Sequence, residues 1–372
     1  MIAEFSVENF FSIKSPQKIS FEPSSDTFMS DEYSCEVKDG VRLLKVGIIY
    51  GANASGKTNI LNAIEFFRML VLRMPKDRNE KTRVVPFMLD DTSRNEMTKM
   101  SMSFYINQSK FILTFELNAK YIYSETLIVY DSIRPTKLYS RSYDAETDST
   151  AIDFGGNLKL TKKSQDVISG NTINNCSVLA AFGKSNVERT RLNDVYDYFA
   201  NQVKDVLAPG MLLSGYVKSR LDKDENGDLK KFILNFLKAS DFNIEDVVLH
   251  EEEELITPEL EQLIQNAPIG NEAKAEMLRK GKITNTELTF KHKAGDGLYD
   301  LSEEYESNGT MRFMGLAVIL NFLLKTNRFV PIDEVETSIH YELLAYFLKV
   351  FLANSEGTSQ MLLTTHDINL LN

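Results

Sequence analysis

Residues 51–58 read Gly-Ala-Asn-Ala-Ser-Gly-Lys-Thr and match the pattern G-x-x-x-x-G-K-[ST] at every fixed position. Such a glycine-rich turn opens a helix and directs several backbone N–H groups to one point, which suits the negative charges of a phosphate chain. Lys57 adds a mobile positive charge, and the Thr58 hydroxyl suits Mg²⁺, which prefers oxygen ligands. The spacing predicts a P-loop. The residues expected to contact the nucleotide are Gly51, Asn53, Ala54, Ser55, Gly56, Lys57, Thr58 and Asn59.

A pair of carboxylates, Asp333 and Glu334, directly follows the apolar segment Val330-Pro331-Ile332. In α/β proteins, chemistry is placed at the carboxyl ends of buried strands. Next to a P-loop, Asp333 would hold the Mg²⁺ shell, and Glu334 would polarise the water that attacks the γ-phosphate. Taken alone, such a pair more often forms a turn. The P-loop upstream favours the catalytic interpretation.

Two further polar segments flank this pair in the sequence. The first, residues 306–312, precedes a long apolar helix; Ser307 and Thr310 are good N-capping residues, and Gly309 gives freedom at the turn. A capped helix N-terminus with an approachable glycine backbone is also an anion site, so both interpretations of this turn stay open. The second is His366, which follows an apolar strand and is either a functional group or merely exposed.

The elements that must position these groups are predicted from hydrophobic periodicity. We expect strands at 2–7, 45–50 and 110–117, and a helix that begins after Gly56 and runs through Leu70. Further strands are expected at 285–291, 328–332 and 360–364, and further helices at 310–326 and 341–352. Alternating strands and helices are typical of a parallel sheet with helices on its faces. This sheet would be built from both ends of the sequence.

Three zones of pattern suggest the domain organisation. Residues 1–153 read mostly as short strands around the P-loop, 154–284 as a mostly helical insertion, and 285–372 as the return of strands. In the middle zone, helical stripes are expected at Val195, Tyr198, Phe199, Val203 and Val206, and at Phe232, Ile233, Phe236 and Leu237. Its acidic run at 251–254 predicts a solvated surface with an architectural or partner-binding role.

The composition is that of an ordinary soluble globular protein, with 43% apolar and 26% charged residues, and 372 residues suggest two or three folding units. The longest strongly apolar stretch, Phe313–Leu324, is shorter than the about 20 residues of a membrane helix. Glu4 and Glu8 stand where a secretory signal needs basic and then apolar residues, so we expect a cytoplasmic protein. Cys35 and Cys176 form neither a disulfide framework nor a zinc cluster.

A formal charge of −11 disfavours a surface that binds nucleic acid everywhere. Residues 68–83 are locally basic and leave nucleic-acid contact open, although such a run more often is a solvated helix end and loop. Residues 222–228 match the first six positions of an EF-hand loop, but Ile233 stands where a glutamate is required, so we predict a polar turn. His250 and His292 lack ligands at metal spacing and are expected at the surface.

The order GANASGKT, ESNGT, PIDEVETSIH and LLTTHD resembles that of ABC-type ATPases, the class that includes the heads of SMC and double-strand-break repair proteins. It is most similar to bacterial AAA/ABC-like ATP-binding proteins linked to abortive infection and phage defence. The segments FSVENFFSI and VVPF near the N-terminus resemble the same family. The resemblance covers roughly residues 1–150 and 285–372. It implies an α/β fold: an ABC-type P-loop NTPase core with a mixed sheet, N-terminal antiparallel β elements and an inserted helical subdomain.

The resemblance also implies roles for single residues. Gly51–Thr58 would be Walker A, Asp333 and Glu334 Walker B, Ser307–Thr310 the signature motif, residues 336–340 the D-loop and His366 the switch histidine. Ser307 and Gly309 would contact nucleotide, and Lys57, Glu334 and His366 would act in catalysis, with ATP and Mg²⁺ as cofactors. The chain departs from the family pattern in two motifs: the signature lacks a double glycine, and Gln108 is only a weak match to the Q-loop glutamine. Family members also continue past the switch histidine, so a further C-terminal segment is expected.

The leading function is therefore an ATP-hydrolysing switch that dimerises head to tail, with Lys57 of one chain and Ser307–Gly309 of the other on each nucleotide, and that controls a defence effector. A second is a nucleotide-gated scaffold that hydrolyses slowly and holds a nuclease or toxin. A third is an SMC- or repair-type DNA-binding ATPase. The third is disfavoured by the charge of −11 and by the lack of a long heptad segment.

Overall fold

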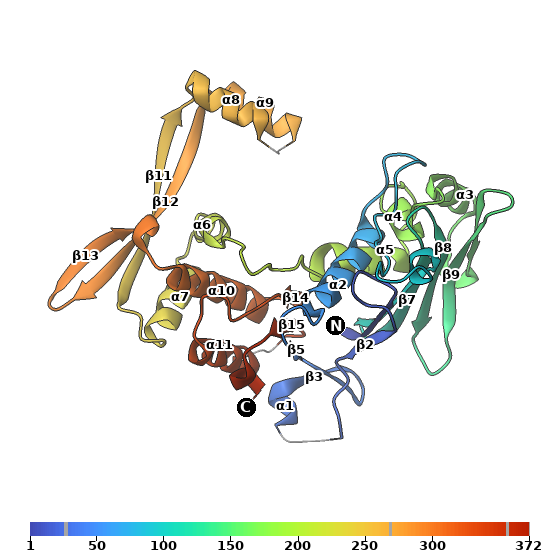
Figure 1. Ribbon diagram of the computed structural model, residues 1–372, viewed down its shortest axis with the longest axis horizontal. Helices are drawn as coiled ribbons and strands as arrows, with labels where there is room; N and C mark the ends of the chain where they lie inside the picture. The colour runs from blue at the N-terminus through green and yellow to red at the C-terminus, as the bar shows by residue number, and fades with distance from the viewer. Residues whose placement is uncertain (26–28, 268–269, 355–356, 372) are drawn as a thin grey trace. The chain divides into compact units, whose positions relative to one another are not determined.

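The computed structural model describes residues 1–25, 29–267, 270–354 and 357–371. Its contacts divide the chain into two compact units (Figure 1). Unit 1 comprises Met1–Met211, Leu323–Thr337 and Leu348–Asn372, and unit 2 comprises Leu212–Phe322 and Ser338–Phe347. The two units have other boundaries than the predicted zones 1–153, 154–284 and 285–372. These zones stay a prediction of the domain organisation.

Unit 1 contains a seven-stranded antiparallel sheet in the order β10-β9-β8-β7-β6-β1-β2. Its strands are β1 (Ile2–Glu8), β2 (Gln17–Ser20), β6 (Thr98–Ile106), β7 (Ser109–Leu117), β8 (Ile122–Tyr130), β9 (Thr136–Asp144) and β10 (Ser149–Phe154). A hairpin of β3 (Ser34–Lys38) and β4 (Val41–Leu44) accompanies it. Alternating buried and half-exposed positions along β1 and β7 explain why period-2 patterning predicted these strands.

The second sheet of unit 1 is parallel and has the order β14-β15-β5. Its strands are β5 (Val46–Tyr50), β14 (Phe329–Ile332) and β15 (Gln360–Thr365). All residues of β14 and β15 are buried, as expected for short apolar runs in a parallel sheet. The predicted α/β fold, with a parallel sheet built from both ends of the sequence, is confirmed.

The side chain of Gln360 joins the two sheets. Its Oε1 accepts a hydrogen bond from Ile2 N at 2.7 Å. Its Nε2 donates to Ile2 O at 2.9 Å and to Leu44 O at 3.0 Å. A fully buried amide needs such partners, and here they fix the first strand of the chain against its last.

The main helix of unit 1 is α2 (Lys57–Leu72), in agreement with the predicted stripe. The ring of Phe67 lies at its centre and contacts Phe5 and Phe115 of the antiparallel sheet, with ring centroids 5.9 and 5.1 Å apart. The other helices of the unit are α1 (Ser30–Tyr33), α3 (Lys162–Asn171), α4 (Val178–Phe182) and α5 (Arg191–Asp197). A helix anchored in this way places the P-loop at its N-terminus on a rigid support.

Unit 2 contains α6 (Ser214–Leu221), α7 (Asp228–Lys238), β11 (Ile244–Leu255), α8 (Pro258–Asn266), α9 (Asn271–Lys280), β12 (Lys282–Ala294) and β13 (Gly297–Ser302). Helices α10 (Asn308–Lys325) and α11 (Tyr341–Asn354) also begin here. The ring of Phe236 on α7 packs against Phe313 and Tyr346, with centroids 4.8 and 5.0 Å apart. Helices α7, α10 and α11 therefore share one core, which the predicted stripe on α7 indicated.

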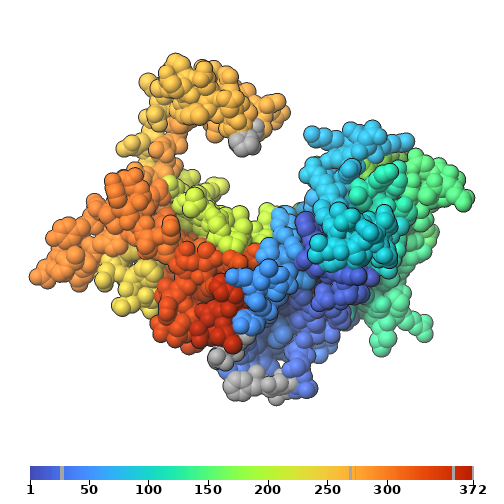
Figure 2. All heavy atoms as spheres, viewed as in Figure 1, coloured from blue at the N-terminus to red at the C-terminus, as the bar shows by residue number. Residues whose placement is uncertain are grey.

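The middle zone differs from its prediction in two places. Helices make up most of its regular structure, but it also contains the strand β11, which pairs antiparallel with β12 along its length, and α8 and α9 stand at the end of this ribbon (Figures 1 and 2). The predicted stripe is only partly helical: Val195, Tyr198 and Phe199 lie in α5 and the helical turn after it, whereas Val203 and Val206 do not. A π-helical turn ends at Gln202, and Lys204 N and Leu207 N then donate to Phe329 O and Pro331 O, so the segment pairs with the edge of β14.

Among the described residues, no helix combines the length and apolar character needed to cross a membrane. The cytoplasmic location stays a prediction.

Candidate nucleotide-binding site

The P-loop lies between β5 and α2, as its sequence context required. Two of its residues have positive φ, Ala54 at 61° and Gly56 at 95°. A Cβ at Gly56 would also lie 3.0 Å from Ser12 Oγ, and one at Gly51 would lie 2.7 Å from Ser55 Oγ. Both fixed glycines of the motif are therefore explained by local geometry, because a larger residue would strain or obstruct the turn.

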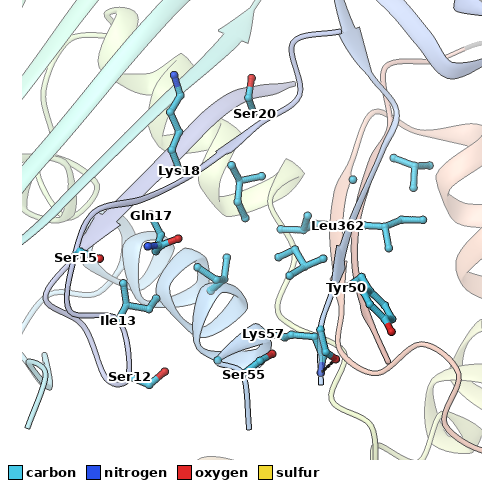
Figure 3. A pocket seen from close by; sticks show the side chains of 18 of the residues that line it. Ser12, Ile13, Ser15, Gln17, Lys18, Ser20, Tyr50, Ser55, Lys57 and Leu362 are labelled. Atoms are coloured by element: carbon cyan, nitrogen blue, oxygen red, sulfur yellow. Dashed lines mark hydrogen bonds between the residues drawn. The ribbon is translucent and has the colours of Figure 1, made fainter. Parts of the chain in front are cut away.

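Lys57 is buried, and its ammonium group points back into the loop (Figure 3). Nζ donates to Gly51 O at 2.7 Å and to Ala52 O at 2.9 Å. Both acceptors of this buried ammonium are thus carbonyl oxygens of the loop itself, and a buried ammonium needs such partners.

Thr58 and Asp333 come from opposite ends of the chain and meet at the end of the parallel sheet. Thr58 Oγ1 lies 2.9 Å from Asp333 Oδ2 and donates to this carboxylate, and Thr364 Oγ1 donates to Asp333 Oδ1 at 2.5 Å. The two residues predicted as Mg²⁺ ligands are thus adjacent. Thr364 was not predicted, since a threonine in an apolar strand is ordinary β composition.

Glu334 follows β14 in a left-handed conformation, with φ of 42°. Its backbone N–H donates to Thr364 Oγ1 at 2.8 Å, and Val335 N donates to Thr364 O at 3.1 Å. Few glutamates adopt positive φ without external support. These bonds supply that support, and they fix the half-buried Glu334 next to Asp333.

His366 lies directly after β15 and contacts Glu336, which the sequence placed in the predicted D-loop but in no catalytic, nucleotide-binding or metal role. Glu336 Oε1 lies 2.6 Å from His366 Nδ1 and accepts a hydrogen bond from His366 N at 2.7 Å. The histidine side chain is 51% exposed, whereas that of Glu336 is only 9% exposed. Only a three-dimensional view could reveal this pairing, because the sequence gives no spacing rule for it.

A cavity of about 970 Å³ opens beside the P-loop (Figure 3). Its walls come from residues 12–20, β5 and the start of α2, and Lys57 and Ser55 lie at one end. Lys14 and Lys18 line it and pair with Asp90 and Glu4, respectively. Ser12 Oγ accepts a hydrogen bond from Asn59 Nδ2 at 2.7 Å. The cavity therefore continues from the phosphate loop into a mixed polar and apolar wall.

Within unit 2, Ser307 acts as an N-cap of α10. Its Oγ accepts a hydrogen bond from Thr310 N at 3.0 Å and contacts Thr310 Oγ1 at 2.8 Å. A Cβ at Gly309 would lie 2.8 Å from the carbonyl oxygen of Ser338. The turn thus has a structural reason for both its serine and its glycine. Its role toward a nucleotide stays a prediction.

Other predicted positions fall outside this arrangement. Gln108 lies in the tight turn between β6 and β7, where both Asn107 and Gln108 have positive φ, so its position lends no support to a Q-loop role.

In the basic segment 68–83, Arg68 pairs with Asp205, and Arg73 and Arg83 both pair with Glu80. Much of the positive charge there is therefore neutralised.

Local contacts show how His250, His292 and the segment 222–228 lie in the structure. His250 is exposed as predicted, whereas His292 is half-buried, with 29% of its side chain exposed, and pairs with Glu306, whose side chain is 5% exposed. Asp224 accepts hydrogen bonds from Leu229 N and Lys230 N. It caps α7 as part of a polar turn. Across the described part of the chain, no group of three or more His, Cys, Asp or Glu residues is arranged to hold a metal ion.

Comparison with known proteins gives one family match. Among curated proteins, none matches the chain. Two solved structures are similar at low identity. The SMC head domain from Thermotoga maritima is 13% identical, with a TM-score of 0.42, and the match covers 100% of this chain and 90% of that chain. An SMC head bound to the C-winged helix domain of ScpA is 12% identical, with a TM-score of 0.44, and the match covers 100% of this chain and 91% of that chain. The family model described as "AAA domain, putative AbiEii toxin, Type IV TA system" matches residues 48–372, which confirms the resemblance inferred from the motifs. The chain therefore belongs to this AAA-domain family.

Proposed function

We propose that the protein binds ATP with Mg²⁺, hydrolyses it and uses the cycle as a molecular switch. The observation that carries the proposal is the contact between Thr58 and Asp333, with 2.9 Å between hydroxyl and carboxylate oxygens. Two motifs from distant parts of the sequence meet there, beside the buried ammonium of Lys57. A chance match to either motif would not predict that meeting.

Nucleotide binding follows from the loop and the cavity. The backbone N–H groups at the start of α2 and the ammonium of Lys57 would hold the phosphates. The cavity of about 970 Å³ beside them has room for a nucleoside, and residues 12–20 and β5 would contact it. Asn59, bonded to Ser12, would hold this wall in place.

The oxygen donors at the end of the sheet fit Mg²⁺. This ion binds through one or two protein oxygens and through substrate phosphates, and it keeps several waters. Thr58 Oγ1 and the Asp333 carboxylate provide such oxygens, already adjacent to the phosphate loop. When bound, the ion would neutralise charge on the phosphate oxygens.

Hydrolysis requires a group that orients water toward the γ-phosphate, and Glu334 supplies it. The hydrogen bonds of the 334–335 backbone fix the position from which this side chain starts, directly after Asp333, the proposed Mg²⁺ ligand. Such a group contributes on the order of 10²- to 10⁴-fold in rate. His366, half exposed at the end of β15, would contact the γ-phosphate or the attacking water.

The switch itself is proposed to be a head-to-tail dimer. Ser307 and Gly309 open the 18-residue helix α10, whose N-terminus favours negative charge. In a second copy, this turn would complete the nucleotide site from the γ-phosphate side. We further propose a defence role with an effector protein as partner in the cytoplasm. The family description, which names a toxin of a toxin–antitoxin system, supports only the toxin–antitoxin context of this proposal.

Replacement of Lys57 tests the proposal at its first step. The Lys57→Ala variant should bind a fluorescent ATP analogue at least about 10²-fold more weakly, or by about 2.7 kcal/mol, because the phosphates lose the only side-chain cation of the loop. Lys184→Ala, at an exposed lysine outside the cavity, serves as the matched control and should bind normally. Unchanged affinity in Lys57→Ala would refute the nucleotide site.

A further inference from the structure

Glu336 makes a contact that the roles described so far do not use. Its Oε1 atom meets both His366 Nδ1, at 2.6 Å, and the His366 backbone N–H, at 2.7 Å. A carboxylate only accepts hydrogen bonds. An unprotonated Nδ1 at this distance would set its lone pair against the oxygen, whereas a hydrogen on Nδ1 makes the contact attractive.

The surroundings of Glu336 strengthen this requirement. Its side chain is 9% exposed, and its Oε2 is buried without a hydrogen-bond partner among the residues that the structure describes. Burial of a carboxylate is costly unless its charge is balanced. The backbone N–H of His366, together with a hydrogen on Nδ1, would stabilise the buried charge at Oε1, so the carboxylate and the imidazole would depend on each other.

The backbone around the pair is fixed as well. Glu334 N and Val335 N both donate to Thr364, at 2.8 and 3.1 Å. Glu336 directly follows these two residues, and His366 lies shortly after Thr364. The contact of Glu336 with His366 therefore adds to the hydrogen bonds that join the same two loops. The imidazole is thus attached to the same rigid segment that carries Glu334.

We propose that Glu336 is a positioning residue for His366: it keeps the hydrogen on Nδ1 and thereby leaves Nε2 as the ring nitrogen that meets the γ-phosphate or its attacking water. The inference rests on the proposed ATPase function for the role of His366. The contact involves only residues of this chain and can be tested separately. In histidines generally, the hydrogen bond made by one ring nitrogen determines which of the two nitrogens carries the hydrogen.

Nitrogen NMR of the nucleotide-free protein tests the contact directly. The chain has only four histidines, and His366→Asn identifies the relevant signals in histidine-labelled protein. Wild-type protein should show His366 with hydrogen on Nδ1. Glu336→Ala should shift it toward the Nε2–H form, while Glu336→Gln, which keeps an acceptor oxygen, should retain the Nδ1–H form. Hydrogen on Nε2 alone in the wild type, or no change in Glu336→Ala, would overturn the proposal.

Kinetics provides the second readout. Glu336→Ala should lower kcat about as much as His366→Ala, on the order of 10-fold or more, with KM for ATP little changed. The double variant should lose no more than either single variant, because both changes remove one unit. Glu342→Ala, at an exposed glutamate 3.8 Å from His340 Nδ1, is the matched control and should keep full kcat.

Multiplicative losses in the double variant would overturn the coupling of Glu336 to His366. The NMR result does not depend on ATP, so failure of the proposed ATPase function would be recognised on its own. It would show as wild-type protein that neither binds nor hydrolyses ATP.

Discussion

Asp333 shows at the residue scale how hydrogen bonds within the chain hold a side chain of the candidate site. Its carboxylate is 4% exposed and accepts hydrogen bonds from Thr58 and Thr364. Burial of an unpaired carboxylate would cost several kcal/mol, and the two hydroxyls offset this cost. The oxygens are therefore held in place, so the proposed binding of Mg²⁺ and phosphate would require less ordering of this side chain.

Thr364→Val should show how much this hydroxyl contributes. Valine keeps the shape but removes the donor to Asp333 and the acceptor for Glu334 N. We expect the free energy of unfolding to fall by about 1–3 kcal/mol, because buried polar groups lose partners, as measured by urea denaturation. Thr364→Ser keeps the hydroxyl and is the matched control. Equal stability of the two variants would contradict this account.

Glu334→Gln should separate ATP binding from hydrolysis. The amide keeps the shape of the side chain but cannot polarise water as a carboxylate does, so the rate should fall by roughly 10²-fold or more. ATP affinity should persist, and dimers should accumulate with ATP. The measurements are steady-state hydrolysis and equilibrium binding. Turnover at the wild-type rate would assign the role of Glu334 to another group.

At the element scale, the sequence predicted the parts of the fold where several local signals agree. The strand at 46–50, the P-loop and helix α2 follow each other without a gap, and the fully buried β14 and β15 are short apolar runs. Asp333 and Glu334 could be predicted as a functional pair for the same reason, because they directly follow the apolar run of β14. What the sequence could not supply is the partner of each strand, and hence the contacts of Gln360, Thr364 and Glu336.

The strand β11 was missed for a physical reason. Its outer half, residues 250–255, is exposed throughout and contains four consecutive glutamates. A two-stranded ribbon with both faces in water has no alternation of buried and exposed residues, and glutamate is a poor strand former. Pairing with β12 across eleven registered positions overrides this local preference.

Asp224→Ala tests the polar turn before α7. Asp224 accepts hydrogen bonds from Leu229 N and Lys230 N at 3.0 and 2.8 Å, so its loss should destabilise the protein by about 1 kcal/mol, as for a helix cap. Glu225→Ala, at an exposed neighbour, is the control and should have little effect. Added calcium should leave the thermal midpoint of the wild type unchanged; a calcium-dependent rise would restore the EF-hand interpretation.

At the scale of the whole molecule, the proposed machinery is divided between the two units. Lys57, Asp333 and Glu334 lie in unit 1, whereas Ser307 and Gly309 lie in unit 2. Within unit 2, the Ser307 hydroxyl caps α10. If Ser307 acts only as a local helix cap, Ser307→Arg should lower the free energy of unfolding by about 1–2 kcal/mol and have no other effect. Head-to-tail assembly predicts a further, larger effect on catalysis.

In the dimer, Ser307→Arg would place a bulky cation against the nucleotide of the other chain. The variant should bind ATP normally but neither dimerise nor hydrolyse it, as measured by light scattering and ATPase assays. Ser302→Arg is the matched control, because it replaces another capping serine of unit 2 outside the proposed signature, and it should dimerise normally.

Mixtures of Ser307→Arg and Lys57→Ala chains provide the decisive comparison. One site of each heterodimer then combines two defects, and the other combines an intact P-loop with an intact 307–309 turn. If a single intact site is competent, hydrolysis should return to a fraction of the wild-type rate in the mixture, although each variant alone is inactive. A Ser307→Arg protein that dimerises and hydrolyses ATP at the normal rate would reduce the turn to a helix cap. The P-loop and Asp333 would then belong to a nucleotide site that works within one chain.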